Sequence, residues 1–96
     1  MIDTYGRTIW MTLPAARDPG LARAYRGVNR AIREAVADRA QLLDLAPVFT
    51  PGWRFRRTMR WRGRRVIVRS MDGVHLGHQG VGIGVKLALD ALSNGA

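Results

Sequence analysis

The chain has 96 residues, a formal net charge of +9 at pH 7 and no cysteine. That length allows at most one domain, and the missing cysteines exclude disulfides, thiolate nucleophiles and cysteine-based zinc sites. Hydrophobic residues at 47% and charged residues at 24% are ordinary for a globular protein, which argues against wholesale disorder. No apolar run approaches the roughly 18 residues of a membrane span.

The first predicted elements are a strand and a helix. The opening residues, MIDTYGRTIW, lack the basic and apolar regions of a signal peptide, so the cytoplasm is the default location. Residues 8–13 are mostly β-branched or apolar and precede Pro14, which predicts a short, buried strand. Asp18 can cap a helix that begins at Pro19 and extends over residues 19–38. Its apolar side chains follow at helical spacing: Leu21, Tyr25, Val28, Ile32 and Ala35 or Val36.

The remaining elements follow the same local logic. Residues 41–45, QLLDL, predict a second strand, and strand–helix–strand within about 40 residues is a βαβ unit with parallel strands and a right-handed crossover. Residues 53–69 alternate in part and have Gly63 near their middle, which predicts a hairpin or an irregular excursion. Residues 80–95 predict a terminal helix, in which Gly82 and Gly84 permit close packing on the sheet. One side of it carries Val81, Val85, Leu89 and Leu92.

Two parallel strands are too few for a sheet that is buried on both faces. We therefore expect residues 1–96 to form a single partial domain, the C-terminal part of a larger α/β domain. Neighbouring strands would come from upstream or from a partner, and exposed sheet edges would favour association. The alternative is a small, self-sufficient α+β fold.

Both histidines of the chain lie in one glycine-rich stretch, SMDGVHLGHQG, at residues 70–80. Asp72 and His75 are the residue types of a catalytic pair, because a carboxylate can orient an imidazole and stabilise its protonated form. From spacing alone, an ordinary polar turn is the simpler interpretation. Asp72, His75 and His78 are also potential metal ligands, but no fourth ligand is evident, and we expect neither a metal nor a cofactor.

The same stretch resembles the last sequence block of the SGNH (GDSL-like) hydrolases, often written DGVHLTPAG. DGVHL matches at residues 72–76 and Gly80 matches the closing glycine, whereas residues 77–79 depart from the pattern. Three upstream segments, TIWMTLPAARDP, YRGVNRAIREA and LLDLAPVF, resemble the late strand of that family, the next helix and the next strand. The likeness is closest to bacterial domains with an arginine-rich hairpin before the block.

This resemblance implies the C-terminal portion of a flavodoxin-like α/β/α fold that hydrolyses or transfers acyl esters through a Ser-His-Asp triad. His75 would be the general base and Asp72 its orienting carboxylate. The GDS block of the nucleophile and the GxND block of the oxyanion hole are both absent, and the serines are Ser70 and Ser93. Because nucleophile and oxyanion donors supply most of the rate enhancement, we expect the chain alone to be a poor esterase that needs an N-terminal half. A longer parent could be secreted or envelope-associated, which leaves the compartment open.

The arginine-rich segment offers an alternative function, binding of an acidic polymer or a nucleic acid. Arginine forks bind phosphate and carboxylate, and aromatic rings stack on bases or sugars. We favour a hairpin with an arginine-rich solvent face and an aromatic core face, and we do not expect nucleic acid as a partner because no recognised binding motif is present. A non-catalytic remnant is the remaining alternative. The candidate anion-binding residues are Arg54, Arg56, Arg57, Arg60 and Trp61.

Overall fold

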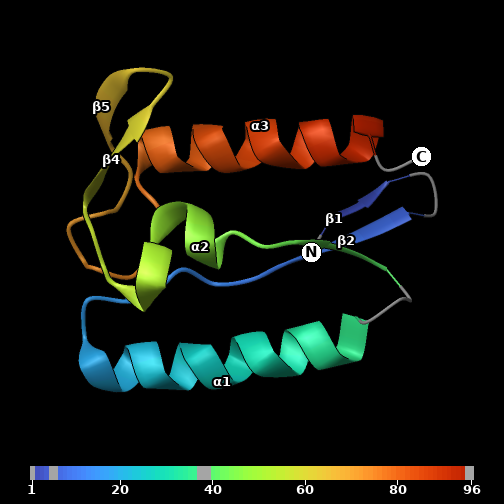
Figure 1. The fold of residues 1–96 in the computed structure, drawn as a ribbon, viewed down its shortest axis with the longest axis horizontal. Coiled ribbons are helices and arrows are strands. Elements are labelled where there is room, and N and C mark those ends of the chain that lie inside the picture. The colour runs from blue at the N-terminus through green and yellow to red at the C-terminus, as the bar shows by residue number, and fades with distance from the viewer. Residues whose placement is uncertain (1, 5–6, 37–39, 95–96) are drawn as a thin grey trace.

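The computed structural model describes residues 2–4, 7–36 and 40–94, and it forms helix, sheet and helix layers (Figure 1). The helices α1 (Pro19–Val36) and α3 (His78–Asn94) lie on opposite sides of a three-stranded sheet of order β1–β2–β3. Its strands are β1 (Ile2–Thr4), β2 (Arg7–Met11) and β3 (Gln41–Leu43). The predicted mixed α/β class is confirmed.

The predicted parallel strand–helix–strand unit is present. β2 pairs parallel with β3 through Ile9 opposite Gln41, whereas β1 pairs antiparallel with β2 and was not predicted. α1 begins at Pro19, and a carboxylate oxygen of Asp18 accepts a hydrogen bond from the N–H of Leu21 at 2.8 Å. The predicted cap is therefore confirmed, while the last predicted residues of this helix, 37–38, lie outside the described residues.

The face that α1 presents to the sheet differs from the predicted one at its centre. Val28 is 44% exposed, whereas its neighbour Asn29 is 1% exposed. The Asn29 side-chain oxygen accepts a hydrogen bond from the N–H of Leu13 at 2.7 Å, and its amide donates to the carbonyl of Leu13 at 2.8 Å. Because Leu13 follows the end of β2, its backbone has no ladder partner, and a buried amide satisfies both of its polar groups.

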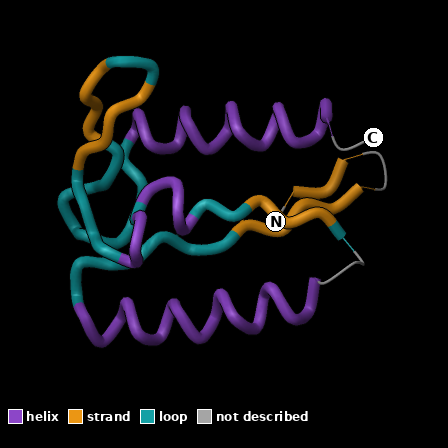
Figure 2. The backbone as a smooth tube through the Cα atoms, viewed as in Figure 1, coloured by secondary structure: helices purple, strands orange, loops and turns teal. Residues whose placement is uncertain are grey.

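The arginine-rich segment forms the predicted hairpin. β4 (Thr58–Trp61) pairs antiparallel with β5 (Arg64–Ile67), and the turn residues Arg62 and Gly63 have φ values of 53° and 79°. Two consecutive left-handed residues are the geometry of a type I′ hairpin turn. Figure 2 shows this ribbon beside the start of α3.

Two short helices, α2 (Ala46–Phe49) and η1 (Pro51–Trp53), join β3 to the hairpin. The main core cluster is Leu45, Phe49, Met59, Val68 and Ile83.

α3 begins at His78, two residues before the predicted start, and packs through glycine. A Cβ at Gly80 would overlap the carbonyl oxygen of Val68, so the helix approaches the chain there more closely than any side chain permits. Gly84 is also buried, but Gly82 faces open space, so its predicted packing role is wrong. The predicted apolar stripe is exposed at Val81, Val85 and Leu89. α3 therefore carries apolar side chains both toward the core and toward solvent.

Candidate functional site

The loop that leads into α3 lies at the end of the molecule where both long helices begin and where β2 and β3 end (Figure 1). Ligands of open α/β sheets bind outside the carboxyl ends of the parallel strands. The fold therefore places the Asp72–His75 stretch at the edge of the sheet where a site is expected.

Within this loop the side chains of Asp72 and His75 are in direct contact. His75 Nδ1 lies 2.6 Å from one carboxylate oxygen of Asp72. The other oxygen accepts hydrogen bonds from the backbone N–H groups of Val74 at 2.8 Å and His75 at 3.0 Å. The side chain of His75 is 79% exposed and that of Asp72 is 46% exposed. The carboxylate is thus fixed in place while the imidazole faces solvent.

These hydrogen bonds stabilise the ionised form of Asp72. The hydrogen bond from the His75 ring, with those from the backbone N–H groups of Val74 and His75, holds the pKa of Asp72 well below its usual range. Asp72 is therefore a carboxylate at neutral pH. When the neutral imidazole donates from Nδ1 to this carboxylate, its Nε2 keeps a free lone pair and can accept a proton.

A glycine makes the loop possible. Gly73 has φ 73°, and a Cβ there would lie 2.8 Å from the Cβ of Arg17. The backbone N–H of Arg17 donates to the carbonyl of Gly73 at 2.9 Å, and the N–H of Ser70 closes the loop on the carbonyl of His75 at 2.9 Å. The tip of the loop is therefore hydrogen-bonded to the β2–α1 connection, and its base is closed by a hydrogen bond within the loop.

A buried arginine, which the sequence pattern did not single out, anchors the same loop from inside. Arg69 is 1% exposed and donates to the carbonyl of Ala15 at 2.7 Å and to that of Val74 at 3.0 Å. Its guanidinium lies 4.7 Å from the ring centroid of Phe55, and that of Arg17 lies 5.0 Å from the same centroid. Burial lowers the pKa of Arg69, with the Asp72 carboxylate opposing this shift. Arginine nevertheless stays charged at neutral pH. The one sequence feature that could have indicated the burial of Arg69 is its place directly after the apolar run VIV at residues 66–68.

His75 also lines a cavity of about 430 Å³. This volume lies within the range of small-molecule pockets. Its walls come from the end of β2, from α1, from the residue before α2 and from the loop: Met11, Thr12, Leu13, Pro14, Tyr25, Leu45, Val74, His75 and Leu76. Since most of these side chains are apolar, the cavity suits a hydrocarbon group next to the imidazole.

The other polar residues near the stretch are placed apart from this pair. His78 is exposed as the first residue of α3, and no group of three potential metal ligands forms among the residues that the structure describes. Ser93 lies exposed near the other end of α3. Ser70 lies in the loop, but within the described part of the chain the ring of His75 is hydrogen-bonded only to Asp72.

The predicted anion-binding residues occupy three kinds of position. Arg56 donates to the carbonyls of Phe49 and Val48, at 3.1 Å and 2.9 Å, where α2 ends. Trp61 packs against the core cluster. The remaining members are exposed: Arg54, Arg57 and Arg60. The guanidinium of Arg56 is thus occupied by backbone groups. Arg60 lies exposed on β4 of the hairpin, and Arg54 and Arg57 are exposed in the segment before it.

Comparison with known proteins places the chain in a family. A search of curated proteins found no match. None of the helices in the described ranges is long and apolar enough to cross a membrane. The sequence profile of DUF459, described as a protein of unknown function, matches residues 3–90. Because this match covers nearly the whole sequence, the chain belongs to the DUF459 family.

Proposed function

We propose that this chain supplies the histidine and aspartate of an SGNH-type serine hydrolase or acyltransferase that acts on acyl esters. The observation that carries the proposal is the 2.6 Å contact between His75 Nδ1 and the Asp72 carboxylate beside an apolar cavity. The resemblance of DGVHL to the last block of the SGNH hydrolases, at the carboxyl end of a parallel strand pair, supports the same role.

In this role His75 is the general base and acid of acyl transfer. Its Nε2 accepts the proton of a serine hydroxyl as the serine oxygen bonds to the ester carbonyl carbon, and Asp72 stabilises the imidazolium. The imidazolium then returns the proton to the departing alkoxide as the carbon–oxygen bond breaks, leaving an acyl-serine and an alcohol. Water, deprotonated by the same imidazole, releases the acid and regenerates the serine, whereas an alcohol acceptor gives transfer.

The nucleophilic serine and the oxyanion donors would come from a segment outside residues 1–96, so the chain is one part of a domain. The exposed apolar stripe of α3 supports this division, because Val81, Val85 and Leu89 form the kind of surface that a complete domain covers. The acyl chain of the substrate would occupy the apolar cavity next to His75.

The test is complementation. The chain is fused behind an upstream SGNH segment that carries a GDS serine, and hydrolysis of p-nitrophenyl acetate is measured. We expect turnover that His75→Ala reduces at least about 1,000-fold and that Asp72→Asn reduces strongly, whereas Ser70→Ala leaves it unchanged. Turnover that is unaffected by His75→Ala, or lost in Ser70→Ala with an unchanged fold, would contradict the proposal.

A further inference from the structure

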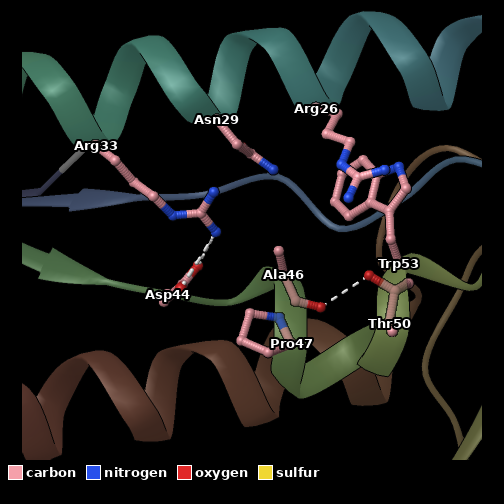
Figure 3. Close-up of a pocket in the computed structure, with 9 residues that line it drawn as sticks. Arg26, Asn29, Arg33, Asp44, Ala46, Pro47, Thr50 and Trp53 are labelled. Atoms are coloured by element: carbon pink, nitrogen blue, oxygen red, sulfur yellow. Dashed lines mark hydrogen bonds and ion pairs between the residues drawn. The ribbon is translucent and has the colours of Figure 1, made fainter.

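Two further cavities, of about 380 and 360 Å³, lie between α1 and the η1 segment. They share two wall residues, Arg26 and Trp53, and they share none with the cavity that contains His75. Figure 3 shows the larger one, with Arg26 extending from α1 toward Trp53. The two cavities therefore form neighbouring compartments of one groove, separate from the proposed catalytic pair.

The backbone is shaped to present the indole of Trp53 to this groove. Gly52 and Trp53 have φ values of 67° and 61°, and the N–H of Trp53 donates to the carbonyl of Thr50 at 2.9 Å. A left-handed conformation is an outlier for a bulky residue, and such backbone strain occurs at ligand-binding positions as well as in turns. Here it gives both compartments a flat aromatic wall.

The smaller compartment carries positive charge that no acidic side chain in its lining neutralises. Its lining includes Arg17, Arg23 and Arg26 and no acidic residue. Arg17 is engaged, because it donates to the carbonyl of Met71 and lies over Phe55. Within the described part of the chain, Arg23 and Arg26 make no hydrogen bond or ion pair, so two arginine forks are available to an anion.

The larger compartment has a different chemistry, because it contains the carboxylate of Asp44. Arg33 donates to its two oxygens at 2.9 and 3.2 Å, and the hydroxyl of Thr12 donates to one of them at 2.6 Å. A carboxylate has about four acceptor positions, so one remains for a hydroxyl group of a ligand. A group that carries only hydrogen-bond acceptors cannot use this position.

We propose that this groove binds an acidic saccharide. Its carboxylate or phosphate lies between Arg23 and Arg26, one ring stacks on Trp53, and a hydroxyl group donates to Asp44. A polynucleotide fits less well, because the phosphodiester groups that link its nucleotides have no hydrogen-bond donor for Asp44. This binding function goes beyond the proposed hydrolase role and does not depend on it.

The full chain is titrated with digalacturonic acid, galactose 1-phosphate, lactose and the dinucleotide pTpT while the indole N–H signals are followed by NMR. We expect the Trp53 signal, assigned with Trp53→Phe, to shift with an acidic sugar and not with lactose. The two acidic sugars distinguish a carboxylate from a phosphate as the preferred group.

Arg26→Ser should weaken binding at least about tenfold, since a charged hydrogen bond contributes roughly that factor or more. Arg30→Ser is the matched control, because Arg30 is exposed on the same helix and lines neither cavity; we expect a change below about twofold. Arg23→Ser gives a second variant if Arg26→Ser disturbs the fold.

Four results would overturn the proposal: an unmoved Trp53 signal, an equal shift with lactose, an equal loss in Arg30→Ser, or tighter binding of pTpT than of either acidic sugar. The first and second exclude an acidic-sugar site, the third reduces the effect to diffuse charge, and the last assigns the groove to nucleic acid.

Discussion

The guanidinium of Arg69 is hydrogen-bonded to the carbonyl of Val74, at 3.0 Å, inside the loop that carries Asp72 and His75. The same guanidinium donates to Ala15, so one buried side chain joins this loop to the segment that follows β2. The position of the aspartate–histidine pair relative to the sheet is therefore set by an interior contact.

Replacement of this arginine should destabilise the protein. Arg69→Met leaves two backbone carbonyls without their donors, and each such loss costs about 1–3 kcal/mol. We expect the free energy of unfolding to fall by about 2–6 kcal/mol in urea denaturation. Arg64→Met, at an exposed position of β5, is the matched control and should change it by less than about 0.5 kcal/mol. Equal effects of the two substitutions would refute the anchoring role.

The ionisation of Asp72 should respond to His75. In the wild-type chain we expect the Asp72 carboxyl to titrate well below the ordinary aspartate pKa of about 3.9, and His75→Ala should raise its pKa toward that value. Since the folded-state pKa is the lower one, the stabilising contribution is present above pH 4 or so and is lost as pH falls toward the folded-state pKa. Carboxyl ¹³C NMR over a pH series checks this, and an unchanged Asp72 titration in His75→Ala would disprove the coupling.

Two glycines provide a matched pair of backbone tests. Gly73→Ala places a Cβ against Arg17 at positive φ, and we expect a loss of about 1–3 kcal/mol in the free energy of unfolding. Gly27→Ala lies on the exposed side of α1 with open space around it, and alanine should stabilise that helix by about 0.5–1 kcal/mol. Thermal denaturation of both variants measures the two changes in stability. A Gly73→Ala protein as stable as the wild type would contradict the predicted strain at this position.

The two sides of α3 should behave differently on substitution. Ile83→Ala removes a buried core side chain and should cost about 2–4 kcal/mol of unfolding free energy. The double variant Val85→Gln, Leu89→Gln changes only the exposed side, so we expect little loss of stability and weaker self-association in sedimentation velocity. A wild-type chain that stays monomeric at all concentrations would show that the exposed apolar side of α3 does not drive self-association.

Local signals predicted most elements of the fold. Asp18 and Pro19 predicted the start of α1, and Gly63 predicted the centre of the hairpin, because caps and tight turns depend on a few neighbouring residues.

Tertiary partners decided what local patterns left open. Asn29 replaces an apolar side chain at the centre of α1 because the backbone of Leu13, sixteen positions away, needs a partner. The burial of Arg69 likewise depends on a distant carbonyl, that of Ala15. Both faces of α3 are apolar, so its periodicity gave no way to choose the one that packs. For the candidate site, the residue types of Asp72 and His75 were predictable, whereas the arginine anchor beneath them was not.

The short separation of Asp72 and His75 along the chain has one more consequence. Their contact is made within a single turn, so its geometry does not require two distant segments to dock correctly. The turn that carries Asp72 and His75 is therefore a self-contained local unit. We expect its internal arrangement to survive transfer of the loop to another protein, provided that Gly73 and Arg69 are transferred with it.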